Sequence, residues 1–370
     1  MNPIPLFKVH MPAAVNDALA RTLASGYIAQ GARVTEFEAG LGGLLGTSRL
    51  CAVSDASAGL TLALFVAGVR PGDEVILSPL SCLATSMPVA NLFAKPVWCD
   101  IDPATGMPDA SHLRRRVTER TRAVIVYCWS GNPVDIESLK SSATGAKFIA
   151  DASEALGAEL SGRSLACATA DFTVYSFSAT RHITTGEGGA LIAATREDLE
   201  RAIRARRYGI HQPSFRLPNG DLNPDSDIAV PGFNFVMNDI AATLGIAQLE
   251  HATSIIGRYR DNGQYFDRTL ANIPGIMLLR RLNGSIPAYW TYSLRAERRA
   301  GLLRKLHANG IGAQRLHLRN DCYSCFSDSR CADALPGVDL FDRENLSIPC
   351  GWWVTAEDRE RIAACIRSGW

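Results

Sequence analysis

Apolar segments of strand length alternate with helical segments through the first 245 residues of this chain. The predicted strands are 74–79, 96–102, 123–129 and 147–151, and the predicted helices among them are 58–69 and 85–94. Strands that alternate with helices build a mostly parallel sheet with helices on both faces. The alternation therefore predicts a large α/β domain over residues 1–245.

The pattern changes at Asn238, where one long helical segment begins and continues to about residue 273. Short strands and helices follow it to Trp370. This change predicts a second, smaller α+β domain, to which we assign residues 246–370. The only long loop-rich stretch is 211–232, and its length is typical of a functional or subunit-contacting loop.

Composition and charge exclude several classes of function. Of the 370 residues, 47% are hydrophobic and 20% are charged, which is sufficient for a large buried core. The net charge of +1 gives no electrostatic basis for binding nucleic acid or an anionic membrane. The first residues lack the basic and apolar regions of a signal peptide, and no segment approaches a membrane span. We expect a cytoplasmic protein that acts on a small molecule.

The ten cysteines are scattered through predicted strands and helices, as small buried residues are, so no disulfides are expected. His317, Cys322, Cys325 and Cys331 have a spacing that could hold zinc. The Cys322 and Cys325 pair lacks a second cysteine pair or a second histidine. We therefore expect no metal, with this cluster as the open alternative.

The segment SFSATRHITTGEGG, from Ser176 to Gly189, carries the strongest functional signal. A buried strand is predicted just before it (171–177), a glycine-rich turn at 184–189, and a further apolar strand at 190–194. The segment resembles the lysine motif that binds pyridoxal phosphate (PLP) in the DegT/StrS-like sugar aminotransferases. The chain has Arg181 at the position of that lysine.

Arginine stays protonated and cannot form the Schiff base of an aminotransferase. No other lysine lies in a segment that the family uses for this purpose. The lysines of the chain are Lys8, Lys95, Lys140, Lys147 and Lys305. Ordinary transamination is therefore expected to be very slow or absent.

The resemblance covers nearly the whole chain and implies the architecture of the fold type I PLP-transferases. That architecture has a large domain with a mostly parallel seven-stranded sheet and a small α+β C-terminal domain. It also implies a homodimer with active sites shared at the interface. Because the lysine motif is altered, we expect PLP or pyridoxamine phosphate (PMP) to bind weakly or not at all.

Two acidic residues match the pyridine-binding part of the family site. Asp151 ends the predicted strand 147–151 and matches the aspartate that pairs with the pyridinium nitrogen. A cap of the following turn is its alternative role. Glu154 lies where the family commonly has a glutamine that faces the phenolic oxygen, and a carboxylate there would repel a phenolate.

The phosphate-binding turn is also altered. The family has Ser-Gly-Thr before a helix, where backbone N–H groups bind the phosphate. The aligned residues here are Asp55, Ala56 and Ser57. Asp55 adds a negative charge near the phosphate position, although aspartate also suits an ordinary helix N-cap. We assign Ala56 and Ser57 to cofactor binding and Asp55 to substrate binding.

The resemblance assigns the remaining pocket positions one by one. Trp129 would stack on the cofactor, Ser176 would lie beside it, and Asn234 would reach the phosphate of the partner subunit. His317 and Arg319 would contact the sugar or the nucleotide of the substrate. Each of these residues could instead be structural.

Three hypotheses about function remain open. The first is a nucleotide-sugar or secondary-metabolite enzyme whose chemistry no longer uses PLP, with Asp151, Glu154, Arg181 and His182 as the catalytic candidates. Changes at Asp55, Glu154 and Arg181 together favour it, whereas a single lysine-to-arginine exchange would explain only Arg181. The second is a PMP-dependent enzyme like the sugar 3-dehydratases, in which His182 or Glu154 carries protons. The third is an inactive relative that serves as a scaffold or partner subunit.

Overall fold

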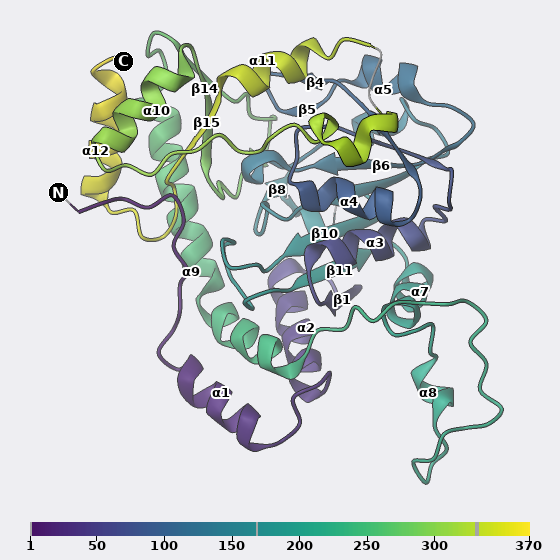
Figure 1. Ribbon diagram of the computed structural model, residues 1–370. Helices are drawn as coiled ribbons and strands as arrows, with labels where there is room; N and C mark the ends of the chain where they lie inside the picture. Colours follow the sequence, from purple (N-terminus) through teal and green to yellow (C-terminus); the bar gives the residue numbers. More distant parts are fainter. Residues whose placement is uncertain (1, 168, 330–332) are drawn as a thin grey trace.

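A seven-stranded sheet forms the centre of the protein (Figure 1). The computed structural model describes residues 2–167, 169–329 and 333–370. The strands lie in the order β1-β11-β10-β7-β6-β2-β3, and β11 is antiparallel to both of its neighbours while the other pairs are parallel. This confirms the predicted mostly parallel seven-stranded sheet. The strands are β1 (Leu50–Val53), β2 (Glu74–Leu77), β3 (Lys95–Trp98), β6 (Thr121–Tyr127), β7 (Lys147–Asp151), β10 (Phe172–Ser176) and β11 (Gly189–Ala193).

Helices cover both faces of this sheet because its side chains are apolar on both faces. In β6, Val124 and Val126 belong to one buried cluster, whereas Ala123 and Ile125 belong to the other. This alternation follows from the two-residue period of a strand. Helices α2 (Ala32–Leu45) and α9 (Asp239–Thr269) pack on the first face. Helices α3 (Ala56–Val66), α4 (Leu83–Asn91) and α7 (Arg196–Arg206) pack on the second.

Helix α9 continues from the large sheet into a second core (Figure 1). There Phe266 packs with residues of the three-stranded sheet β12-β14-β15 and of the helices beside it. These elements are β12 (Ile276–Leu278), β14 (Tyr292–Ala296), α10 (Arg299–Ala308), β15 (Asn345–Ile348) and α12 (Ala356–Arg367). Helix α11 (Pro336–Glu344) lies between β14 and the large sheet, and its Val338 and Phe341 belong to the buried cluster on the second face of that sheet. The domain boundary that we predicted at 245/246 falls within α9, and the division into 1–245 and 246–370 remains a prediction.

The predicted elements differ from the observed ones mainly at their ends. The helix predicted at 58–69 begins at Ala56, because the Asp55 side chain caps it by accepting a hydrogen bond from the Ala58 N–H. The strand predicted at 96–102 is divided into β3 and β4 (Ile101–Asp102). Proline-containing helix α4 ends before the predicted residue 94.

Short elements connect these layers. They are α1 (Val15–Ala24), β5 (Met107–Pro108), α5 (Ala110–Arg116), η1 (Trp129–Gly131), α6 (Ile136–Lys140), β8 (Glu159–Leu160), β9 (Arg163–Ser164), η2 (Leu165–Cys167), β13 (Ser285–Ile286), η3 (Asn320–Cys322) and η4 (Ser324–Ser329). Among the described residues, no helix combines the length and the apolar character that crossing a membrane requires.

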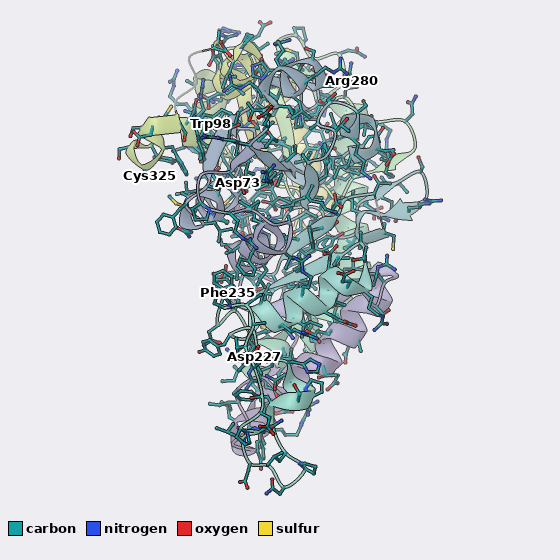
Figure 2. The ribbon with its side chains drawn as sticks, turned by 90° about the vertical axis from the view of Figure 1, so that its right-hand side faces the viewer. Asp73, Trp98, Asp227, Phe235, Arg280 and Cys325 are labelled. Atoms are coloured by element: carbon teal, nitrogen blue, oxygen red, sulfur yellow. The ribbon has the colours of Figure 1, made fainter. Side chains whose placement is uncertain are left out.

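The loop-rich stretch 211–232 projects from the body of the protein beside α7 and contains the short helix α8 (Gln212–Phe215) (Figure 1). Asp227 of this loop and Phe235 lie in the narrow lower part of the side view, far from Arg280 (Figure 2). The loop exposes Leu217, Leu222 and Val230 to solvent. Exposed apolar side chains on a projecting loop are typical of a contact surface.

Candidate active site

Three parallel strands place polar side chains at their carboxyl ends. Tyr127 ends β6, Asp151 ends β7 and Ser176 ends β10. Tyr127 and Asp151 are register partners in adjacent strands. Ligands of open α/β sheets bind at this edge, so the fold brings these side chains to the position expected for a binding site.

Glu154 is the centre of a buried hydrogen-bond network just beyond this edge. Its Oε1 accepts hydrogen bonds from the Tyr127 hydroxyl (2.5 Å) and from Nε2 of His317 (3.0 Å). Its Oε2 accepts a hydrogen bond from the backbone N–H of Ser130 (2.7 Å). The side chain is only 2% exposed, so the network replaces the water that a carboxylate requires.

The backbone of η1 is shaped to reach Glu154. Ser130 and Gly131 both have positive φ (53° and 85°), which directs the Ser130 N–H to the carboxylate. A Cβ at Gly131 would lie 2.8 Å from the carbonyl oxygen of Glu154 and 2.8 Å from the backbone nitrogen of Tyr289. Only glycine fits this close approach.

The Arg181 side chain enters the same network. Its NH1 lies 3.5 Å from Oε1 of Glu154, and its Cζ lies 4.3 Å from the centroid of the Trp290 ring. Trp290 is itself held by a hydrogen bond from Nε1 to the Thr180 carbonyl (2.6 Å). The buried Nε of Arg181 has no hydrogen-bond partner among the described residues. The guanidinium therefore combines a carboxylate contact, a cation–π contact and at least one unused donor.

The network determines the protonation states of its members. Burial alone would raise the pKa of Glu154, but the hydrogen bond from His317, the charge of Arg181 and the hydrogen bond from Tyr127 hold it below its usual value. Burial and the charge of Glu154 raise the pKa of Tyr127 well above its usual value. Glu154 is therefore a carboxylate and Tyr127 a neutral phenol at neutral pH, so Tyr127 is the donor in the hydrogen bond between them.

Asp151 accepts its hydrogen bonds from uncharged groups, whereas Glu154 also contacts the charged Arg181. Its Oδ2 accepts a hydrogen bond from the Thr85 hydroxyl (2.7 Å), and its Oδ1 accepts one from the Ser153 N–H (3.1 Å). Burial raises the pKa of Asp151, and these two hydrogen bonds partly offset the increase. Both candidate roles of Asp151 fit this position: it caps the turn after β7, and it lies buried at the carboxyl edge of the sheet.

His182 points away from the network. Its Nε2 donates to the carbonyl oxygen of Ala288 (3.0 Å), and its ring lies 4.5 Å from that of Tyr259 in α9. Burial lowers the pKa of His182 to about 4, so the imidazole is neutral at physiological pH. The described contacts do not join it to Arg181 or Glu154, and its catalytic role remains a prediction.

The turn before α3 is occupied by its own carboxylate. Oδ1 of Asp55 accepts from the Ala58 N–H (2.9 Å), and its Oδ2 accepts from the Ser54 hydroxyl (2.9 Å). Ala56 is the first residue of the helix, and Ser57 follows it. Asp55 therefore already satisfies a backbone donor that an anion at this helix terminus would use.

The other predicted pocket residues lie in three places. Trp129 is buried and contacts the network through its ring, 5.9 Å from the rings of Tyr127 and His317. Asn234 is exposed on the segment that follows the projecting loop. Arg319 pairs with Asp321 and Asp339 instead of joining the network. The structure thus gathers Trp129 and His317 at Glu154, but not Arg319.

Sequence reasoning missed several contributors, namely Tyr127, Ser130, Trp290, Thr85 and Cys82. Tyr127 ends a strand that we had predicted from its apolar pattern, so its place at the carboxyl edge was a usable signal. Trp290 has no such signal, because nothing in its local sequence points to Arg181. Cys82 is near enough to Arg181 for the two charges to interact, yet burial raises the pKa of its thiol.

The possible metal cluster cannot be traced in full, since Cys331 lies outside the described residues. Cys325 lies on η4, where the neighbouring Phe326 packs edge-on against Trp98, and both Cys325 and Trp98 can be followed in Figure 2. His317 is bonded to Glu154 and Tyr127. Within the described ranges, no group of three or more metal-binding side chains comes together.

This arrangement is suited to acid–base chemistry. Glu154 accepts only, so Nε2 of His317 carries the proton of their hydrogen bond. A carboxylate that orients an imidazole in this way is a common arrangement for a general base. Arg181 adds a positive charge and an unused donor to the same buried site.

Comparisons with known proteins identify the family of this chain. The family described as "DegT/DnrJ/EryC1/StrS aminotransferase family" matches residues 10–367. A dTDP-4-dehydro-2,3,6-trideoxy-D-glucose 4-aminotransferase of Saccharopolyspora spinosa is 32% identical over 284 residues, which cover 75% of this chain and 73% of that protein.

Two solved structures are similar over almost their whole length. AtS13 from Actinomadura melliaura is 36% identical with a TM-score of 0.93, and the match covers 100% of both chains. The sugar aminotransferase CalS13 from Micromonospora echinospora is 33% identical with a TM-score of 0.93, and the match covers 99% of this chain and 100% of that one. These similarities agree with the fold type I architecture that the sequence predicted.

Proposed function

Because the chain belongs to the DegT/DnrJ/EryC1/StrS aminotransferase family, we propose that it acts on a keto sugar of the kind this family handles, but by acid–base chemistry without PLP. The relative from Saccharopolyspora spinosa is named for a nucleotide-linked 4-keto sugar. The observation that carries the proposal is the contact of Glu154 with both Arg181 and His317. It provides an oriented base and a fixed cation in one buried site.

Three features fit a bound PLP poorly. Arg181 replaces the residue that would hold the cofactor covalently. Asp55 places a carboxylate at the helix terminus where the phosphate would bind. Glu154 is held as a carboxylate near the position expected for the phenolic oxygen. Asp151 is the one residue whose position still suits the pyridine ring, so no step is assigned to the cofactor.

The proposed reaction begins at Nδ1 of His317. This nitrogen removes a proton from the carbon next to the sugar carbonyl, while Glu154 holds the imidazole in position through Nε2. The electron pair of the broken C–H bond forms a carbon–carbon double bond, and the carbonyl π electrons move onto the oxygen. Return of a proton from His317 to that carbon restores the C–H bond and the carbonyl, so the hydrogen at this carbon exchanges with solvent, and a proton delivered to the opposite face would give the epimer.

Arg181 and Tyr127, which contact the same carboxylate oxygen of Glu154 as His317 does, would assist this step. The unused donor of Arg181 can stabilise the negative oxygen that forms, and this effect is strong because the site is buried. The Tyr127 hydroxyl donates to Oε1 of Glu154 (2.5 Å) and so helps to hold the carboxylate in position.

Solvent exchange tests this function directly. The protein, with no cofactor added, is incubated in D₂O with a nucleotide-linked 4-keto sugar, and deuterium at the carbons beside the carbonyl is followed by NMR. We expect exchange by the unaltered protein and a loss of about 100-fold or more in His317→Gln, since general acid–base groups commonly contribute this much. His307→Gln, an exposed histidine of α10, is the control and should retain full exchange.

The outcome separates the remaining hypotheses. Exchange that appears only after PMP is added would contradict the proposal and favour the hypothesis of a PMP-dependent enzyme. The buried Asp151 is the residue that supports this hypothesis. No exchange under either condition would favour a scaffold role.

We further propose that the active protein is a homodimer. Apolar surface that a partner copy would bury is provided by the exposed Tyr27 and by the projecting loop, which includes the exposed Leu222. Light scattering during size-exclusion chromatography tests this proposal, and a monomer at micromolar concentration would contradict it.

A further inference from the structure

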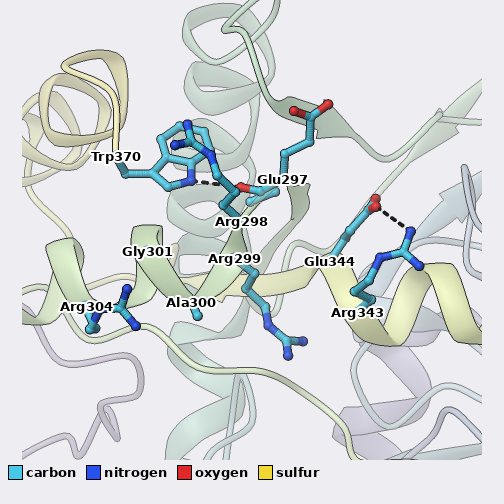
Figure 3. Close-up of a pocket in the computed structure, with 10 residues that line it drawn as sticks. Glu297, Arg298, Arg299, Ala300, Gly301, Arg304, Arg343, Glu344 and Trp370 are labelled. Atoms are coloured by element: carbon cyan, nitrogen blue, oxygen red, sulfur yellow. Dashed lines mark hydrogen bonds and ion pairs between the residues drawn. The ribbon is translucent and has the colours of Figure 1, made fainter.

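A groove lined by arginines lies on the small domain, where β14 ends and α10 begins (Figure 3). Its volume is about 620 Å³, which is within the range of small-molecule sites. Its lining shares no residue with the Glu154 network. The residues that form it are Ala296, Glu297, Arg298, Arg299, Ala300, Gly301, Arg304, Arg343, Glu344 and Trp370.

The charges in this groove are not balanced by the protein. Glu344 is paired twice, with Arg343 (3.0 Å) and with Arg295 (3.2 Å). Within the described part of the chain, Arg298, Arg299 and Arg304 form no ion pair, and Glu297 is the only acidic side chain of the lining left to oppose them. The side chains that line the groove therefore carry an excess of about two positive charges.

Arg299 is held in place by backbone rather than by a carboxylate. Its NH1 donates to the carbonyl oxygens of Asp342 (2.5 Å) and Asn345 (3.4 Å). Burial and the nearby charge of Arg315 lower its pKa. A bound anion would reduce this unfavourable charge, whereas Arg298 and Arg304 are exposed and can move to meet a ligand.

Trp370 gives the groove an aromatic wall. Its indole Nε1 donates to the Glu297 carbonyl (2.8 Å), a contact that Figure 3 shows as a dashed line. The ring lies so close to α10 that a Cβ at Gly301 would be 3.1 Å from Cδ1 of the indole. The ring is thus fixed in orientation, and it can contact a planar group.

We propose that this groove binds a nucleoside diphosphate, with the phosphates at Arg298, Arg299 and Arg304 and the base beside Trp370. Two adjacent phosphates match the excess of positive charge, and guanidinium groups bind phosphate oxygens in pairs. The groove is separate from the proposed active site, so the bound nucleotide would act as an effector instead of a substrate.

Calorimetric titration with thymidine diphosphate, inorganic pyrophosphate and thymidine tests this proposal at constant ionic strength. The probes are added to the unaltered protein, to the double variant Arg298→Gln/Arg304→Gln and to Glu154→Gln. We expect thymidine diphosphate to bind more tightly than pyrophosphate and thymidine to bind least. The double variant should weaken the diphosphate at least about tenfold, and Glu154→Gln should leave a site of unchanged affinity.

Arg114→Gln/Arg163→Gln is the matched control, because it removes two exposed arginines outside the groove. Its affinity for thymidine diphosphate should remain within about twofold of the unaltered protein. Equal weakening by both double variants would overturn the proposal in favour of net charge alone. Absence of binding, or binding lost in Glu154→Gln but kept in Arg298→Gln/Arg304→Gln, would also overturn it.

Weaker binding of thymidine diphosphate to Trp370→Leu would support a base beside the indole. Equal affinities for the diphosphate and pyrophosphate in every protein would contradict that placement and leave only a phosphate site. This binding test needs no turnover, so its result is independent of the proposed keto-sugar reaction.

Discussion

Arg181 NH1 lies 3.5 Å from Oε1 of Glu154, and the two side chains are only 9% and 2% exposed. The resemblance to the family motif predicts that Arg181 lies at the position of a reactive lysine and that Glu154 lies at the position of a glutamine. If both predictions hold, the two departures from the family motif form a single buried ion pair.

The first prediction concerns the stability of this pair. Glu154→Gln should lower the free energy of unfolding by about 3 kcal/mol, because it leaves the Arg181 charge buried without its carboxylate. Arg181→Met should cost less, about 1–2 kcal/mol, since Glu154 keeps its bonds to Tyr127, His317 and Ser130. Urea unfolding of both variants and of the double variant gives the coupling energy, which we expect to exceed about 1 kcal/mol.

A surface pair provides the comparison for this cycle. Arg33 and Glu36 lie 2.7 Å apart, but they are 44% and 51% exposed. Their coupling should be about 0.5 kcal/mol or less. Equal coupling energies for the two pairs would show that burial does not strengthen the Arg181 contact.

Local sequence patterns were enough to predict the sheet and the position of Arg181. They did not predict the hydrogen-bond network around Glu154. Strand period and the glycine-rich turn placed Arg181 after β10, because these are properties of neighbouring residues. The bond between Glu154 and His317 joins residues 163 positions apart, and Trp290 contacts Arg181 from a distant segment of the chain. Such contacts depend on how the two cores pack, which no short motif records.

The second prediction concerns Gly131, which allows the backbone to approach Glu154. Gly131→Ala should destabilise the protein by about 3 kcal/mol or more, because φ is 85° and the new Cβ would lie 2.8 Å from two backbone atoms. Gly43→Ala in α2 is the control, since its Cβ would meet nothing within 4 Å. There alanine should be neutral or stabilise by up to about 1 kcal/mol. Thermal and urea unfolding measure both changes.

The third prediction concerns the effect of pH on the buried His182. Burial lowers its folded pKa from 6.5 to about 4, so the unfolded chain takes up a proton at a higher pH than the folded protein does. The contribution of neutral His182 to the free energy of unfolding is therefore fully present above pH 6.5. It is lost as the pH falls toward 4, by up to roughly 3 kcal/mol. His182→Gln removes this titration but keeps a donor for the Ala288 carbonyl.

Unfolding free energies of the unaltered protein and of His182→Gln, measured in urea between pH 4 and pH 7.5, should converge as the solution becomes acidic. Other groups titrate equally in both proteins, so the difference between the two curves isolates His182. A difference that is constant with pH would mean that His182 has a similar pKa in the folded and unfolded states.

The last prediction concerns the effect of Glu154 and Asp55 on PLP binding, in addition to that of the arginine at position 181. Arg181→Lys alone should bind PLP weakly, because Glu154 stays a carboxylate and Asp55 still bonds the Ala58 N–H. Adding Glu154→Gln and Asp55→Ser removes both negative charges, and serine still caps a helix well. The triple variant should therefore bind at least about tenfold more tightly than Arg181→Lys, as followed by the visible absorbance of bound PLP. If Arg181→Lys alone binds as tightly as the triple variant, the lysine was the only barrier, and the carboxylates at 55 and 154 have no part in excluding the cofactor.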